Sequence, residues 1–222
     1  MKRAIKQFWS LLHGACACIL LAGGVGIQAA EISSPSAPLT AIDILLQPDA
    51  TMLQHAAAGN DRLLKVYPKG FALDAAHTPH ITMLQCFVRT ADLDKVYAAE
   101  DKVFAAANLS AMKLEAFKYY YAPADATTGV AGICAKPSPE ILKLQAAVIA
   151  AAKPFMQRTA TIGAFTAPHE SPATDAAMIQ YVSTFVPKMT GAHYNPHVSI
   201  GVAPKGYRRL NRHHQGGWSD ID

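Results

Sequence analysis

A tetrapeptide of the form Pro-His-Xaa-Ser/Thr occurs twice in the chain and opens a run of strand-forming residues each time. The two copies are Pro79-His80-Ile81-Thr82 and Pro196-His197-Val198-Ser199. Residues i and i+2 of a β-strand project to the same face. We therefore expect His80 to point with Thr82, and His197 with Ser199, into one shared cleft.

Strands and helices are expected to alternate around the two motifs. Hydrophobic periodicity predicts strands at 42–46, 80–88, 113–121, 130–136 and 198–202. It predicts helices at about 50–64, 91–108, 139–153 and 174–186, with Asp49, Ser138 and Thr174 as N-caps. Residues 41–204 are thus expected to form an α+β domain. We expect it to be pseudo-symmetric and bilobed, with two mostly antiparallel sheets, helices outside, and one motif strand per lobe facing a central cleft.

The two ends of the chain differ in composition from its middle. Residues 1–30 combine Lys2, Arg3 and Lys6 with an apolar run and small residues at Ala29 and Ala30, the pattern of a cleaved signal peptide. An uncleaved membrane anchor is the alternative, which the glycines of the run disfavour. We therefore expect export to the periplasm or the medium, without membrane association after cleavage. Residues 31–40 are expected to be a flexible lead-in and residues 205–222 a poorly ordered tail.

The charge of the exported part is close to zero. Residues 31–222 hold 17 Lys and Arg against 16 Asp and Glu. Such a balance argues against a long surface for polyanions, so DNA is not an expected partner. A small phosphate-bearing ligand fits it better. We expect the protein to be a monomer.

Two cysteines remain after the expected cleavage, Cys86 and Cys134. An exported protein can form a disulfide, but both residues lie in predicted strands, where the geometry often prevents bridging. We expect two buried free thiols, with a disulfide as the alternative.

The paired motifs suit phosphodiester hydrolysis. That reaction needs a base for water, an acid for the leaving oxygen, and donors for the phosphoryl oxygens. Two histidines can divide the acid and base roles near neutral pH, and the hydroxyls of Thr82 and Ser199 can bind the phosphate. A metal site is the main alternative, because His77 and His193 lie just upstream of the two motifs. Those spacings suit a helix, and the prolines at 79 and 196 disfavour one.

The doubled His-Xaa-Ser/Thr pattern resembles the signature of the two-histidine (2H) phosphoesterase superfamily, which includes 2′-5′ RNA ligase-like proteins and cyclic nucleotide phosphodiesterases. The resemblance covers roughly residues 39–204. It implies a bilobed α+β fold, no metal or other cofactor, and opening of 2′,3′-cyclic or related phosphodiesters of nucleotides or RNA ends. It also implies that His80 and His197 are the acid and base, and that Thr82 and Ser199 bind phosphate.

Three tyrosines are candidates for stacking on a nucleobase: Tyr194, Tyr119 and Tyr121. Packing in the core or at its rim is the alternative for each. The family continues past the second motif strand with further sheet, whereas this chain continues with a polar tail. We therefore expect the second lobe to lack an edge strand, and we keep two alternative functions, a non-catalytic nucleotide-binding protein and a 2′-5′ RNA ligase.

Overall fold

The computed structural model describes residues 37–166 and 171–207, together with the backbone of a strand at residues 2–7. The α+β class expected from the sequence is confirmed. The helices and strands follow one another as β1 (Lys2–Gln7), β2 (Leu39–Gln47), α1 (Ala50–Val66), β3 (Ile81–Arg89), α2 (Leu93–Ala106), β4 (Ala116–Pro123), β5 (Thr128–Ala135), α3 (Pro139–Ala152), β6 (Met156–Gln157), α4 (Pro172–Ser183), α5 (Phe185–Met189) and β7 (His197–Pro204).

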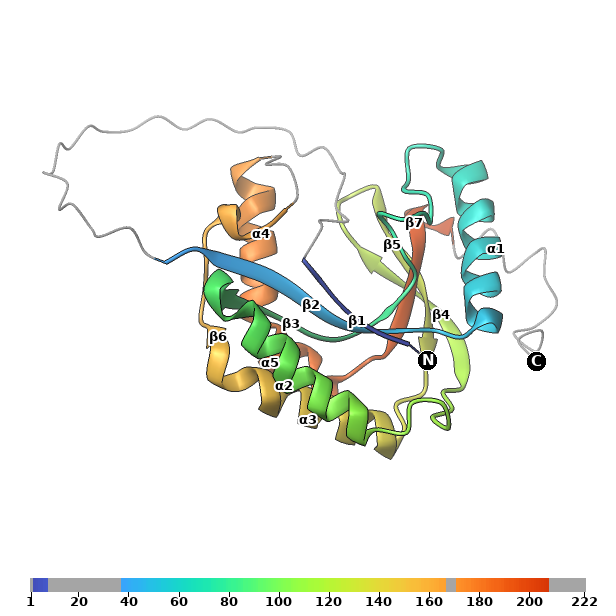
Figure 1. Cartoon of the computed structure of the whole chain (residues 1–222). Coiled ribbons are helices and arrows are strands. Elements are labelled where there is room, and N and C mark those ends of the chain that lie inside the picture. Colours follow the sequence, from blue (N-terminus) through green and yellow to red (C-terminus); the bar gives the residue numbers. More distant parts are fainter. Residues whose placement is uncertain (1, 8–36, 167–170, 208–222) are drawn as a thin grey trace, which may run out of the picture.

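The described strands form one antiparallel sheet in the order β1-β2-β3-β7-β5-β4, with β6 beside β3 (Figure 1). The expectation of two separate sheets is wrong, because the described strands belong to one sheet. The two motif strands, β3 and β7, are joined through a single residue pair, Ile81 and Val198. Away from that pair, β3 bonds to β2 and β7 bonds to β5 over most of their lengths. The sheet therefore has two halves that meet at the motifs.

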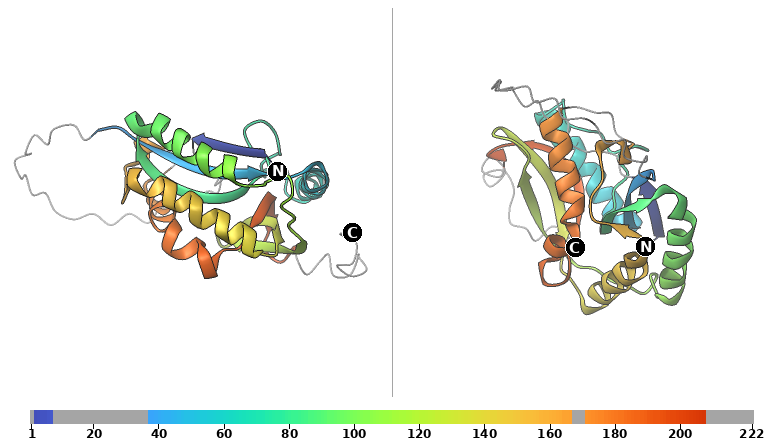
Figure 2. Two further views of the ribbon diagram at one scale, coloured as in Figure 1. Left: turned by 60° about the horizontal axis from the view of Figure 1, so that its bottom comes forward. Right: turned by 90° about the vertical axis from the view of Figure 1, so that its left-hand side faces the viewer.

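Helices cover both faces of this sheet. On one face α2 and α3 lie side by side, and α1 packs along β7 (Figures 1 and 2). The close approach of α1 depends on Gly59, because a Cβ there would lie 2.7 Å from Cδ1 of Ile200. On the other face, α4 packs on β3.

Alternation along β2 and β3 separates two hydrophobic clusters. Ile42, Ile44 and Cys86 belong to the larger cluster, which includes residues of α1, α2 and α3. Ala41 and Phe87 belong to the smaller cluster, which includes Met178 and Val182 of α4. We call these two sides of the sheet the core face and the site face. Side chains alternate between faces along a strand, so Asp43 points to the site face.

Side-chain caps fix where three helices begin. Asp49 accepts a hydrogen bond from the Met52 amide and Ser138 from the Ile141 amide, which confirms the two expected caps. The third helix, α4, begins earlier than expected, because Ser171 rather than Thr174 is its N-cap. Pro172 then occupies the first helical position, where its missing amide hydrogen costs nothing.

The N-terminal strand lies within the segment expected to be a signal peptide. β1 pairs antiparallel with β2, from Lys2 opposite Gln47 to Gln7 opposite Ile42. The rest of the expected signal peptide, and residues 31–36 of the lead-in, lie outside the described residues. So do residues 208–222 of the expected tail. Among the helices that the structure describes, none is long and apolar enough to cross a membrane.

The second half of the sheet has an edge strand, contrary to expectation. β7 is an inner strand between β3 and β5, and β4 forms the edge. The pairing of β5 with β7 extends from Thr128 opposite Pro204 to Cys134 opposite His197. Cys134 and Cys86 are both buried and free, which confirms the expected thiols.

Candidate active site

The four motif side chains lie on one face of the two motif strands. His80, Thr82, His197 and Ser199 are all partly exposed, whereas the intervening Ile81 and Val198 are buried. This alternation confirms that each histidine projects with its own hydroxyl residue. Ile81 and Val198 are antiparallel partners. By the same register, His80 lies across from Ser199, and Thr82 lies across from His197. The two motifs therefore run antiparallel to each other, side by side.

Both histidines are oriented by the same backbone contact. Nδ1 of His80 donates to the Thr78 carbonyl oxygen at 2.7 Å. Nδ1 of His197 donates to the Asn195 carbonyl oxygen, also at 2.7 Å. A carbonyl oxygen only accepts, so the hydrogen must be on Nδ1 of each ring. When an imidazole with this hydrogen is neutral, its Nε2 carries no hydrogen and can accept a proton.

A buried carboxylate faces the first motif. Oδ2 of Asp43 accepts hydrogen bonds from Thr82 Oγ1 and Gln85 Nε2, each at 3.1 Å. The same oxygen lies 3.5 Å from His80 Nε2. Asp43 is only 5% exposed, and its Oδ1 has no hydrogen-bond partner among the described residues.

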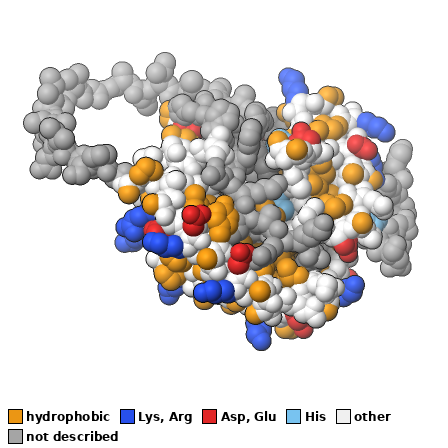
Figure 3. Space-filling model, viewed as in Figure 1, with side chains coloured by type: hydrophobic (Ala, Val, Ile, Leu, Met, Phe, Trp, Pro, Cys, Tyr) orange, Lys and Arg blue, Asp and Glu red, His pale blue; other side chains and the backbone are white. Residues whose placement is uncertain are grey.

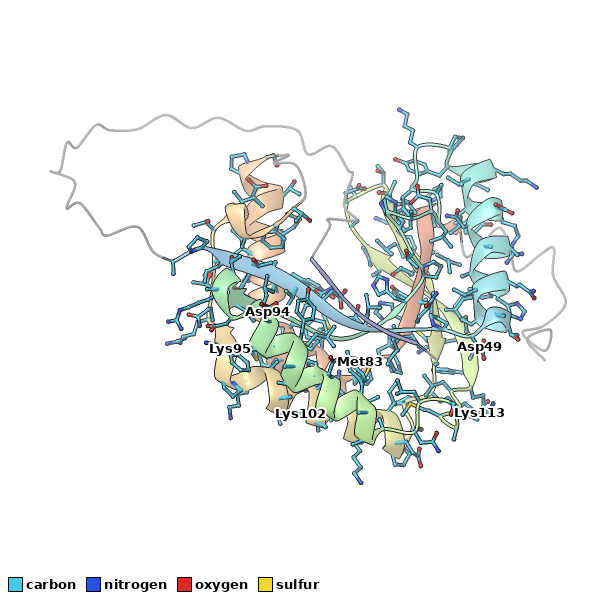
Figure 4. The ribbon with its side chains drawn as sticks, viewed as in Figure 1. Asp49, Met83, Asp94, Lys95, Lys102 and Lys113 are labelled. Carbon is cyan, nitrogen blue, oxygen red and sulfur yellow. The ribbon has the colours of Figure 1, made fainter. Side chains whose placement is uncertain are left out.

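A β-bulge in β3 brings Thr82 and Gln85 to the same carboxylate. Ile44 pairs with Leu84 and Leu45 with Thr82, so Met83 is an extra residue in β3 (labelled in Figure 4). Thr82 and Gln85 are three residues apart and would point to opposite faces of a regular strand. The extra residue brings both to the site face, where they bond to one carboxylate.

A tyrosine from β4 faces the second motif. The hydroxyl of Tyr120 lies 3.3 Å from Ser199 Oγ, and its ring packs edge-on against the His197 imidazole with centroids 4.6 Å apart. Tyr120, Gly132 and Ser199 form one row across β4, β5 and β7. A Cβ on Gly132 would lie 2.1 Å from Tyr120 Cε1, so only glycine leaves room for the ring.

The two motif hydroxyls have different hydrogen-bonding capacity. An ionised carboxylate only accepts, so the Thr82 hydroxyl hydrogen is directed to Asp43. Ser199 and Tyr120 carry two hydroxyl hydrogens, and their mutual bond uses one. The second hydrogen is available to another acceptor. The second motif therefore presents a free donor, whereas the first presents a donor already bonded to a carboxylate.

His197 is biased toward its neutral form. Burial lowers the pKa of His197 below its ordinary value of 6.5, and the charge of nearby His80 acts in the same direction. The hydrogen bond to Asn195 and the charge of Asp43 act in the opposite direction. The two imidazoles therefore lie close enough for the charge of His80 to affect the pKa of His197.

The three tyrosines expected as stacking candidates lie away from the site face. Tyr194 is 7% exposed, belongs to the larger core cluster, and donates its hydroxyl to the Thr82 carbonyl at 2.9 Å. Tyr119 and Tyr121 are partly buried against the same cluster. The prediction that these tyrosines stack on a base is therefore wrong for the site face. Because side chains alternate along β4, Tyr120 points to the site face, whereas Tyr119 and Tyr121 point to the core face.

An exposed tyrosine on α4 was not identified from the sequence. Tyr181 is 40% exposed and packs edge-on against Phe185 at 6.1 Å between ring centroids. Burial raises the pKa of Tyr181 to about 12, and the charge of Asp43 acts in the same direction. Tyr181 in turn contributes to the raised pKa of Tyr120. It therefore lies on a helix that packs on β3, within electrostatic reach of Asp43 and Tyr120.

The histidines upstream of the motifs do not assemble a metal site. His77 stacks on Phe71 at 5.0 Å, and its Nδ1 lies 3.4 Å from Asp74 Oδ1. His193 is exposed in the short 3-10 helix η4 (Gly191–His193). Within the described ranges, no group of three or more His, Cys, Asp or Glu side chains is placed to hold a metal ion.

No family model matches the chain, and no curated protein matches it. The resemblance to two-histidine phosphoesterases receives no support from these comparisons. It rests on the two motifs alone, beside the geometry of the residues described above.

Proposed function

We propose that this protein is a metal-independent phosphodiesterase that opens 2′,3′-cyclic or related cyclic phosphodiesters of nucleotides or RNA ends. The observation that carries the proposal is the facing pair of motifs, in which two imidazoles held by the same Nδ1 contact share one face with two hydroxyls. His80 and His197 supply the acid and the base, so the reaction needs no cofactor.

Phosphate binding is the proposed role of the motif hydroxyls. Ser199, with Tyr120 beside it, has a hydroxyl hydrogen available for a phosphoryl oxygen. Thr82 takes part by rotating its hydroxyl from Asp43 toward the phosphate. Donors of this kind stabilise the charge that develops on a phosphoryl group during in-line displacement.

The finer architecture is also part of the proposal. We infer that the halves β2-β3 and β7-β5 are pseudo-equivalent lobes on either side of a central cleft. The support is the antiparallel pairing of Ile81 with Val198 and the identical Nδ1 contacts of the two histidines. Each lobe then delivers one histidine and one hydroxyl to opposite sides of a bound phosphorus.

A small ligand fits the charge distribution. Lys and Arg side chains are scattered among Asp and Glu on the face seen in Figure 3 rather than gathered into one patch. The scattered charge supports a nucleotide or RNA end as the ligand, and the signal-peptide pattern of residues 1–30 supports an exported, periplasmic or secreted protein, which we propose to be a monomer. A 2′-5′ RNA ligase needs a longer basic surface, and steeply salt-dependent RNA binding would favour it.

The test is hydrolysis of nucleoside 2′,3′-cyclic phosphates in excess chelator. His80→Ala and His197→Ala are each expected to lower kcat/KM by about 100-fold or more, because a positioned acid or base contributes about 10²–10⁴-fold. His193→Ala is the matched control, since His193 is exposed and lies before the second motif. Equal rates in the wild type and the two motif variants would disprove the proposal.

A second candidate is nucleotide binding without turnover. The observation that favours it is the engagement of the first motif by Asp43, which contacts both His80 and Thr82. Binding of 2′,3′-cyclic nucleotides, with no product formed over a broad panel of phosphodiesters, would support this function instead of catalysis.

A further inference from the structure

The carboxylate of Asp43 makes the two halves of the site chemically unequal. It extends from β2, is almost fully buried, and places Oδ2 within 3.5 Å of His80 Nε2. Its remaining contacts to Thr82 and Gln85 hold the carboxylate in that position. The corresponding neighbour of the second motif is a phenol, Tyr120, which packs against His197.

A buried carboxylate and a phenol have opposite effects on a neighbouring imidazole. An opposite charge within about 4–6 Å favours the charged form of a group, and burial without such a partner favours the neutral form. His80 has the carboxylate at its reactive nitrogen. His197 has an aromatic edge and a hydroxyl pair beside it, and burial lowers its pKa.

The other titratable groups near the two imidazoles are tyrosines, a cysteine, the His77–Asp74 pair and Lys118 on β4, whose positive charge acts on Cys134. Burial raises the pKa of Tyr120 on β4, Tyr181 on α4, and Tyr194 before β7. Burial likewise raises the pKa of Cys134, the β5 residue opposite His197. In the loop before β3, His77 and Asp74 contact each other. Asp43 is thus the anionic side chain in contact with the first motif, and the phenol of Tyr120 takes the corresponding place at the second.

We propose that Asp43 is a positioning residue that stabilises the protonated form of His80, so that His80 is the general acid and His197 the general base. This inference rests on the proposed function. Nε2 of His197 takes a proton from water as the water oxygen bonds to phosphorus. One ring P–O bond breaks, and Nε2 of His80 gives its proton to the departing sugar oxygen. The product is a phosphomonoester, and solvent returns the proton from His197 to His80.

The experiment compares pH profiles of kcat/KM for the wild type and Asp43→Asn. The alkaline limb of such a profile reports the group that must be protonated, and the acidic limb the group that must be deprotonated. Asp43→Asn keeps the shape and removes the charge. We expect the alkaline limb to move down by about one pH unit, which is a tenfold loss of activity on that side. The acidic limb is expected to move down by less, because the charge of Asp43 acts on the pKa of His197 more weakly than burial does.

Glu100→Gln is the matched control. Glu100 is another fully buried acid, on α2 at the core face, and burial raises its pKa to about 8. Its replacement also removes a buried carboxyl group, but far from the site face, and we expect neither limb to move. An alkaline limb that stays fixed in Asp43→Asn, or an acidic limb that moves instead, would overturn the inference.

A second measurement separates this inference from the proposed function. NMR titration of the His80 imidazole requires no turnover, and its midpoint is expected at lower pH in Asp43→Asn than in the wild type. An unchanged midpoint would show that Asp43 does not hold the charge of His80. If the midpoint differs between Asp43→Asn and the wild type, but the wild type has no hydrolytic activity, the proposed function is contradicted and the coupling between Asp43 and His80 is retained.

Discussion

At the scale of single residues, three consecutive tyrosines show how a strand divides similar side chains between two tasks. Tyr119 and Tyr121 pack toward the core cluster, and Tyr121 lies against Gly129, where a Cβ would approach its ring to 2.5 Å. Tyr120 points the other way, across Gly132, to Ser199 and His197. A hydroxyl and a ring contact are thus combined in one side chain at the second motif.

Removing only the Tyr120 hydroxyl tests its role in phosphate binding. Tyr120→Phe keeps the ring against His197 and removes the partner of Ser199. We expect kcat/KM for a cyclic phosphodiester to fall about tenfold, because a hydrogen bond to a charged group contributes about 1.5–3 kcal/mol. Steady-state kinetics of the variant beside Tyr121→Phe would check this. A loss in Tyr121→Phe as large as in Tyr120→Phe would assign the effect to the strand rather than to the hydroxyl.

At the scale of elements, α1 holds β7 in place through one buried amide. Nδ2 of Asn60 donates to the carbonyl oxygens of Ile200 and Phe71, and its Oδ1 accepts from the Leu73 amide. Next to Ile200, Gly201 has a φ of +147°, and a Cβ there would lie 3.1 Å from Asn60 Nδ2. The helix, the strand and the loop before the first motif therefore depend on each other.

Asn60→Ala is expected to destabilise the fold as a whole. It leaves a buried amide and two carbonyl groups without their partner, and each unsatisfied buried group costs about 1–3 kcal/mol. We expect a loss of about 2–5 kcal/mol in the free energy of unfolding, measured by urea denaturation. Asp61→Ala, at the exposed neighbouring position, is the control and is expected to stay within about 0.5 kcal/mol of the wild type. Similar midpoints for the two variants would contradict the role of Asn60.

The sequence predicted those parts of the elements that depend on local periodicity. Alternation placed His80 with Thr82, and His197 with Ser199, and two helix caps were found from residue type. The sequence did not identify Asp43 or Gln85 as site residues, because their position depends on the bulge at Met83 and on the register of β2 with β3. Such pairing between distant strands leaves no local signal. The same holds for Tyr120. Its place beside Ser199 depends on the pairing of β4 with β5 and of β5 with β7, which the sequence does not reveal.

At the scale of the whole molecule, side chains reinforce the narrow connection between the two halves of the sheet. The Tyr194 hydroxyl, just before β7, donates to the Thr82 carbonyl of β3. Gln145 of α3 donates to the Met83 carbonyl and accepts from the Gly191 amide in the segment that leads to β7. Both contacts tie the approach of the second motif to the backbone of the first. The spacing of the two histidines therefore depends on the core face as well as on the sheet.

The rim of the site leads to a prediction about the substrate beyond its phosphate. Tyr181 on α4 is exposed, and its pKa responds to the charge of Asp43, so we predict that it stacks on a nucleobase in place of Tyr194, Tyr119 and Tyr121. Stacking on an aromatic side chain contributes about 1–3 kcal/mol per base. Tyr181→Ala is expected to raise KM for a nucleoside 2′,3′-cyclic phosphate about tenfold, and to leave KM for a base-free cyclic phosphodiester, such as ethylene phosphate, unchanged.

The two substrates separate base recognition from damage to the catalytic groups. Tyr97→Ala is the matched control, because Tyr97 is 37% exposed but belongs to α2, which covers the core face. We expect this variant to leave both KM values unchanged. If Tyr181→Ala weakens both substrates equally, α4 acts by supporting β3 and not by contacting the base. If it weakens neither, the base lies elsewhere, and the cleft recognises little more than the cyclic phosphate itself.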